Sequence, residues 1–149
     1  MLYHTQEISG TNGDCFRAAI ASLLDAERVE DVPHFFDGNP DLDEGWAAVR
    51  KWLMETRGLH MVTVSFQGDL EGVLEYMRFQ NPGVYYLISG HSGVDNHVVV
   101  ACGDKIIHDP AGKPPGKHSL VGPCTDGYYW LKFLLPLFHG QHHNQHYPA

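Results

Sequence analysis

Residues 93–110 read GVDNHVVVACGDKIIHDP, and this stretch decides how the second half of the chain folds. Two runs rich in β-branched residues flank a tight turn at Gly103 and Asp104, a pattern typical of a β-hairpin. Antiparallel neighbours bring residues near the open end of a hairpin side by side. We therefore predict that His97, which opens the first strand, lies beside Asp109, which closes the second.

Further strand-like segments accompany this hairpin. Residues 60–66 (HMVTVSF), 84–90 (VYYLISG) and 128–136 (YYWLKFLLP) are rich in β-branched and aromatic residues. Gly, Asn or Pro turns separate the later segments. The second half of the chain is therefore expected to form a mainly antiparallel sheet.

The first half of the chain shows helical periodicity instead. Apolar residues recur at helical spacing over residues 14–24, 42–58 and 69–79. Asp14 is placed to cap the first helix, and Gly58 offers a stop for the second. Helices followed by strands indicate an α+β fold, with an N-terminal helical part packed on a C-terminal antiparallel β-sheet.

Length and composition predict one domain. The 149 residues suffice for a single core, and we assign residues 1–138 to that domain. Residues 139–149 (HGQHHNQHYPA) are expected to form a flexible tail that could bind nickel or zinc adventitiously. Its histidines are His139, His142, His143 and His146. We expect no metal site in the folded part and no cofactor.

The net charge and the hydropathy of the sequence disfavour two classes of binding partner, nucleic acids and membranes. The formal charge of −8 disfavours nucleic acid, which needs clustered Lys and Arg. The sequence has no apolar run long enough to cross a bilayer, so no membrane partner is expected. The N-terminus lacks a secretory signal, so we expect a cytoplasmic protein with reduced thiols. Three irregularly spaced cysteines form neither a disulfide framework nor a zinc knuckle.

Cys15 stands at the start of the first predicted helix, directly after a glycine-rich turn. The partial positive charge at a helix N-terminus favours a thiolate there. A nucleophilic thiol also needs a base and a group that orients the base. The predicted pair of His97 and Asp109 supplies both.

Three short motifs follow one another along the chain in this order: Asp14-Cys15, His97-Val98-Val99-Val100 and Asp109-Pro110. In this respect the chain resembles papain-like cysteine peptidases, closest to the bacteriocin-leader peptidase domains, and it is similar to small bacterial and phage-encoded proteins that share VPHF (residues 32–35). The resemblance implies a papain-like fold, with Cys15 as nucleophile, His97 as general base and acid, and Asp109 as the orienting residue. It also implies a side-chain donor to the oxyanion, for which Gln6 and Asn12 are both candidates.

Residues near these motifs are assigned by position. The neighbours of Cys15, Asp14 and Phe16, are expected to contact substrate, and Phe16 stands where the family has glycine. The loop before His97 is expected to line the cleft through Gly90, His91 and Gly93. His108 is expected to point away from the site. We predict structural roles for Cys102 and Cys124.

These features favour hydrolysis of a peptide or isopeptide bond through an acyl-enzyme. The expected partner is a peptide or protein substrate. An acyltransferase or amidase acting on a small-molecule amide would use the same three residues. A module that binds a peptide or protein without turnover is an alternative of a different class. The sequence leaves the oligomeric state open.

Overall fold

The structure is a computed structural model that describes residues 1–7, 13–37 and 41–137. Asn12 and the His-rich tail lie outside the described residues. Within the described ranges, no helix is long and apolar enough to cross a membrane.

Within the described part of the chain, three α-helices form where the sequence predicts them. Helix α1 spans Cys15–Leu23, α2 spans Leu42–Arg57 and α3 spans Leu70–Gln80. A single 3-10 turn, Val29–Asp31, follows α1. Helix α2 ends at Gly58, whose φ of 64° lies in the left-handed region that glycine adopts without strain.

Five strands of the described residues make one antiparallel sheet, which confirms the predicted α+β class. Their bounds are Leu59–Phe66 (β1), Tyr85–His91 (β2), Asn96–Cys102 (β3), Lys105–His108 (β4) and Tyr129–Pro136 (β5). The spatial order is β1-β5-β2-β3-β4, and every neighbouring pair is antiparallel. Strand β1 comes before α3 in the chain, so the sheet is not confined to the C-terminal half.

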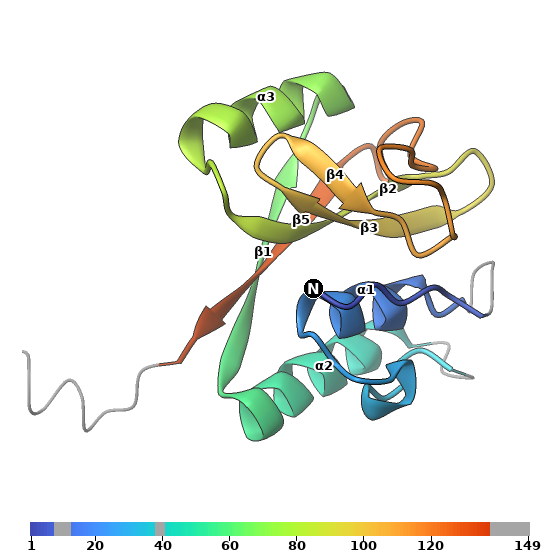
Figure 1. Cartoon of the computed structure of the whole chain (residues 1–149), viewed down its shortest axis with the longest axis vertical. Helices are drawn as coiled ribbons and strands as arrows, with labels where there is room; N and C mark the ends of the chain where they lie inside the picture. Colours follow the sequence, from blue (N-terminus) through green and yellow to red (C-terminus); the bar gives the residue numbers. More distant parts are fainter. Residues whose placement is uncertain (8–12, 38–40, 138–149) are drawn as a thin grey trace, which may run out of the picture.

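Helices cover both faces of this sheet (Figure 1). Helices α1 and α2 bury Ile20 and Leu53 against one face, together with Val100 of β3. Helix α3 buries Met77 against the other face, together with Val99. Successive strand residues point to opposite faces. Since both faces of the sheet are covered, residues on both sides of β3 are apolar, and its apolar run is continuous.

The hairpin at residues 93–110 is present as predicted. Strands β3 and β4 pair antiparallel, and Gly103 takes the left-handed conformation of the turn, with φ of 57°. His108 pairs with Val100, and the register shifts between Val100 and Ala101. Asp109 follows directly after β4, at the end of the hairpin where β3 begins.

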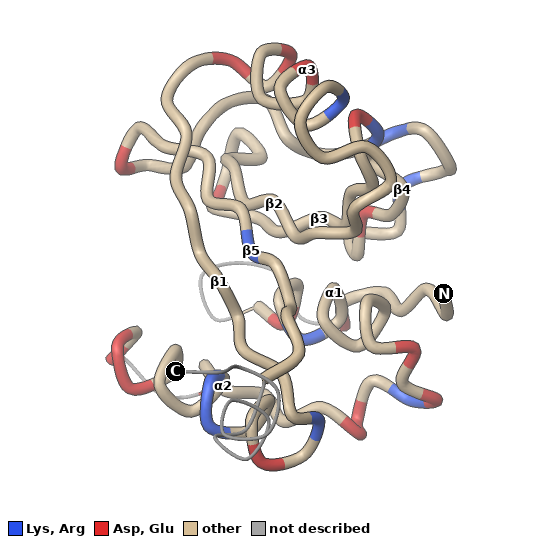
Figure 2. Tube along the Cα trace, turned by 90° about the vertical axis from the view of Figure 1, so that its left-hand side faces the viewer, with Lys and Arg blue, Asp and Glu red and all other residues tan. Residues whose placement is uncertain are grey.

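Lys132, on β5, is a charged side chain that is buried within the sheet. The strands carry few Lys, Arg, Asp or Glu, and the blue position on β5 is Lys132 (Figure 2). Lys132 is only 5% exposed, and its ammonium lies 4.5 Å from the centre of a Trp46 ring. Burial, together with the nearby charge of Arg50 and against an opposing effect of Cys124, lowers the pKa of Lys132 to about 8.

Candidate active site

Cys15 is a free thiol on the first residue of α1, and it is partly buried. Asp14 is the N-cap residue, but the prediction that its side chain caps the helix is wrong. The carboxylate accepts a hydrogen bond from the backbone N–H of Glu7 at 3.0 Å and makes none with the first turn. Asp14 thus ties the N-terminal segment to the start of α1.

His97 and Asp109 form a buried pair at the open end of the β3–β4 hairpin. The distance between His97 Nε2 and Asp109 Oδ1 is 2.6 Å, and the residues are 7% and 1% exposed. Because Nε2 faces the carboxylate, Nδ1 is the ring nitrogen left for a second partner. Both residues line one pocket, and Cys15 contributes to the raised pKa of the imidazole.

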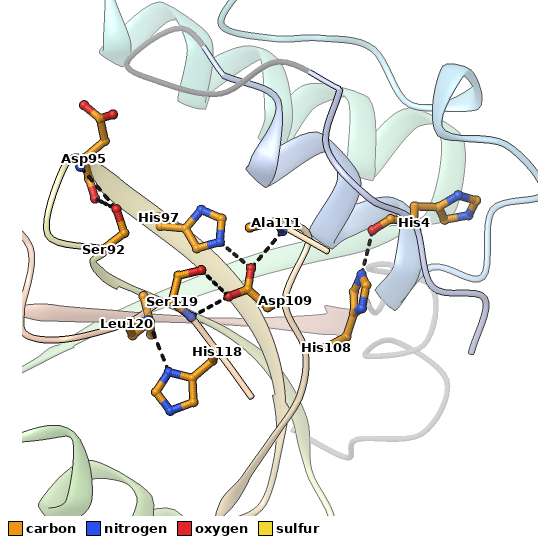
Figure 3. Close-up of polar contacts among 10 residues, drawn as sticks. All are labelled: His4, Ser92, Asp95, His97, His108, Asp109, Ala111, His118, Ser119 and Leu120. Atoms are coloured by element: carbon orange, nitrogen blue, oxygen red, sulfur yellow. Dashed lines mark hydrogen bonds and ion pairs between the residues drawn. The ribbon is translucent and has the colours of Figure 1, made fainter. Parts of the chain in front are cut away.

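Asp109 is held by several donors besides His97 (Figure 3). The backbone N–H of Ala111 donates to Oδ1 at 2.8 Å. Ser119 donates to Oδ2 twice, from its backbone N–H at 2.6 Å and from its hydroxyl at 2.7 Å. Burial raises the pKa of Asp109, but the hydrogen bonds from His97, Ala111 and Ser119 outweigh it and hold that pKa well below its usual value.

The same network decides the charge of His97. Burial alone would lower the pKa of the imidazole. Hydrogen bonding and charge from Asp109, together with a contribution from Cys15, outweigh burial and raise the pKa of His97 to about 9. At neutral pH His97 is therefore an imidazolium. Such a cation favours the thiolate form of a neighbouring cysteine.

These side chains open into a pocket of about 470 Å³, a size typical of small-molecule and peptide sites. Cys15 and His97 lie in its wall, and Ser119 reaches it from the loop that holds Asp109. The full lining is Gln6, Gly13, Cys15, Ser92, Val94, Asp95, Asn96, His97, Ala111 and Ser119. A carbonyl group bound here would have access to both the thiol and the imidazole.

Of the two candidate oxyanion donors, the structure describes Gln6. Gln6 comes from the N-terminal segment, and its backbone N–H donates to the carbonyl of Pro110 at 2.7 Å. This bond fixes Gln6 next to the residue that follows Asp109. Gln6 lines the same pocket as Cys15.

The two predicted neighbours of Cys15 lie elsewhere. Phe16 is 5% exposed, and its ring packs edge-on against Trp46, with 4.9 Å between ring centroids. Asp14 is 2% exposed. Neither belongs to the pocket lining. Successive helical residues point about 100° apart. The residue after Cys15 therefore turns into the core instead of toward substrate.

The loop before His97 lines the pocket, but not through the three predicted residues. Gly90 is buried in β2 opposite His97, and a Cβ there would lie 2.7 Å from a backbone oxygen. His91 accepts from the Gly93 N–H through its own Nδ1 at 2.9 Å. The residues of this region that do line the pocket are Ser92, Val94 and Asp95 of the loop and Asn96, the first residue of β3.

The remaining histidine and cysteine predictions concern residues outside the pocket lining. His108 bonds to the His4 carbonyl, away from Asp109 (Figure 3). Cys124 is buried, and burial raises its pKa to about 11, so its thiol is protonated at neutral pH. Cys102 ends β3. In the part of the chain that the structure describes, no three His, Cys, Asp or Glu side chains converge as a metal site.

Ser119 is the site residue that sequence reasoning missed. It lies ten residues after Asp109, in a loop with no motif, and only the fold brings its hydroxyl to the carboxylate. The stretch Asp109-Pro110-Ala111 carried the available signal, because an aspartate before a turn often accepts a backbone N–H two residues on.

Comparisons of this chain with protein-family models, with curated proteins and with solved structures find no match.

Proposed function

We propose that the chain is a thiol-dependent hydrolase of papain-like type that cleaves a peptide or isopeptide bond. The observation that carries the proposal is the buried His97–Asp109 pair, whose imidazole shares the wall of an open pocket with Cys15. A raised histidine pKa beside a cysteine at a helix N-terminus favours a reactive thiolate.

The proposed reaction begins with attack of the Cys15 thiolate on the amide carbonyl carbon. Gln6 and the backbone N–H of Cys15 stabilise the oxyanion that forms. The His97 imidazolium gives its proton to the leaving amine, and the C–N bond breaks to leave a thioester on Cys15. Neutral His97 then takes a proton from water, which attacks the thioester and releases the acid. Asp109 keeps the imidazole oriented throughout.

The papain-like assignment is part of this proposal. It draws on the order of the motifs and on the packing of α1 against β3, with Val98 and Val100 in the same core as Ile20. A reactive thiol needs a reducing compartment, which fits a cytoplasmic location.

Phe16 bears on the alternative of a binding module without turnover. An aromatic side chain beside the cysteine would support that alternative if it filled the pocket. Its ring instead lies in the core against Trp46. The pocket remains open next to the thiol, so this departure from the family pattern does not oppose catalysis.

Alkylation with iodoacetamide, followed by mass spectrometry of each cysteine-containing peptide, tests the proposal. We expect Cys15 to react at pH 6.5 at least about tenfold faster than Cys102, Cys124 or glutathione, because only Cys15 adjoins an imidazolium. His97→Ala should remove this advantage. His60→Ala, an exposed histidine on β1, serves as the matched control.

Turnover of p-nitrophenyl acetate separates a hydrolase from a binding module. A hydrolase releases more than one equivalent of nitrophenolate per chain, and Cys15→Ser abolishes this release. If labelling is spread evenly over the three cysteines, or is no faster than that of glutathione, the catalytic assignment is wrong.

A further inference from the structure

The N-terminal segment, residues 3–7, is held along α1 by a series of contacts. The backbone N–H of His4 donates to the Ser22 hydroxyl at 2.8 Å, and its ring Nε2 donates to the Ala26 carbonyl at 2.6 Å. At the other end of the segment, the Glu7 N–H donates to Asp14. The segment thus runs from the end of α1 back to its start, where Cys15 lies.

Two further bonds join this segment to the end of β4. His108 Nε2 donates to the carbonyl of His4 at 2.6 Å, and the Gln6 N–H donates to the carbonyl of Pro110 at 2.7 Å. The two bonds are two residues apart on each of the two segments, and they flank Asp109 in the sequence. At the end of the hairpin, the Asp109 side chain therefore holds His97. Its two neighbours hold the N-terminal segment, His108 through its ring and Pro110 through its backbone carbonyl.

The His108 ring also fixes the direction of this segment. It stacks on the Tyr3 ring, with 4.7 Å between centroids and 8° between planes. Figure 3 shows the two neighbouring side chains bonding in different directions, His108 to His4 and Asp109 to His97. A donor and a flat face on one side chain thus set the position of the residues that precede Gln6.

We infer that His108 is a positioning residue for Gln6. By anchoring the His4 carbonyl, it sets the register of the N-terminal segment, so that Gln6, two residues further on, lines the pocket together with Cys15. The inference rests on the proposed function, in which Gln6 stabilises the oxyanion. His108 itself touches neither the thiol nor the reacting carbonyl.

Two reactions of Cys15 distinguish this role from a general structural one. Iodoacetamide alkylates the thiolate at a saturated carbon and forms no oxyanion. With p-nitrophenyl acetate, the sulfur attacks the carbonyl carbon, the C–O bond breaks, and nitrophenolate leaves with the electron pair while an acetyl thioester forms. Only the second reaction passes through an oxyanion that Gln6 can stabilise.

We expect Gln6→Ala to slow acetylation by about 100-fold and His108→Ala by about tenfold, since the glutamine is still present in the latter. Iodoacetamide alkylation should change by less than about twofold in both variants. The double variant should be no slower than Gln6→Ala alone, because the two residues act through one interaction. His108→Gln, whose amide can donate to the same carbonyl, should restore most of the rate. His60→Ala is the matched control.

His108→Phe keeps the stacked ring without the donor and replaces His108→Ala if that variant fails to fold. The inference is overturned if acetylation is unchanged, if both reactions slow equally, or if the two substitutions add in the double variant. An unreactive Cys15 in the parent protein overturns the proposed function and this inference together. A reactive Cys15 with unaltered acetylation in the His108 variants overturns the inference alone.

Discussion

Replacing Asp109 with asparagine is expected to remove the proton from His97 at neutral pH. The pKa of His97 is raised to about 9 because hydrogen bonds and charge from Asp109 and Cys15 outweigh burial. Asparagine keeps the size of the side chain but removes its charge. Burial then dominates, and we expect the His97 pKa to fall to 6.5 or below.

The size of the effect follows from these pKa values. At pH 7.5, a group with a pKa of about 9 is about 97% protonated, and one with a pKa of about 6.5 is about 9% protonated. The imidazolium population thus falls about tenfold, and the alkylation rate of Cys15 at pH 7.5 should fall about tenfold with it. At pH 10 free thiols ionise without help, so the two rates should converge.

Stability should change in the same variant. The raised pKa of His97 stabilises the folded state by about 3 kcal/mol. This contribution is fully present below about pH 6.5 and is lost as the pH rises through about 9. The lowered pKa of Asp109 contributes above its usual value near 3.8 and is lost on acidification. Asp109→Asn should therefore lower the free energy of unfolding most between about pH 4 and 6.5.

Three measurements test this prediction: NMR titration of labelled histidine, iodoacetamide kinetics from pH 5 to 10, and urea unfolding at pH 6 and 9. Asp104→Asn, in the exposed turn of the same hairpin, removes an equal charge far from the site and serves as the control. A His97 pKa still near 9 in Asp109→Asn would refute the electrostatic argument. So would a loss of alkylation rate that is equal at every pH.

Three further substitutions and one control substitution have defined outcomes in urea unfolding. Ser119→Ala removes one hydroxyl donor from the Asp109 carboxylate and should lower the free energy of unfolding by about 1.5–3 kcal/mol. Lys132→Met should raise that free energy by about 1–3 kcal/mol at pH 7, since burial disfavours the ammonium. It should also abolish the gain in stability expected between about pH 8 and 10.5, where the unfolded chain binds the Lys132 proton more tightly than the folded one. Gly90→Ala should destabilise by about 1–3 kcal/mol because its Cβ would lie 2.7 Å from the Gly122 carbonyl oxygen. Gly122→Ala, with open space around it, should cost less than about 1 kcal/mol.

Local sequence patterns predicted the helices and strands, because the helical and strand spacings of apolar residues are both visible over short stretches of sequence. The helices over 14–24, 42–58 and 69–79 appear as α1, α2 and α3, and the hairpin of residues 93–110 appears with its turn at Gly103. The contact of His97 with Asp109 was predictable for the same reason, since a hairpin fixes which residues meet. The faces were harder to predict, because no period tells which side of the sheet a helix covers.

The surroundings of Cys15 could not be read in this way. Phe16 adjoins it in sequence, yet the turn of the helix sends its ring into the core. Ser119 is distant in sequence, yet it donates twice to Asp109. Which residues line a pocket depends on how several loops pack, and chain adjacency carries little of that information.

The cost of burying the Asp109–His97 pair favours a chemical role for it. A charged pair in a core often stabilises no more than apolar residues of the same volume. Here the carboxylate is nearly inaccessible and receives bonds from Ala111 and Ser119 as well as from the ring, which keeps its charge. The imidazole that it charges lines an open pocket together with Cys15. A module that only binds a peptide has no need to hold a proton there at neutral pH, whereas acyl transfer through Cys15 requires that proton for the leaving amine.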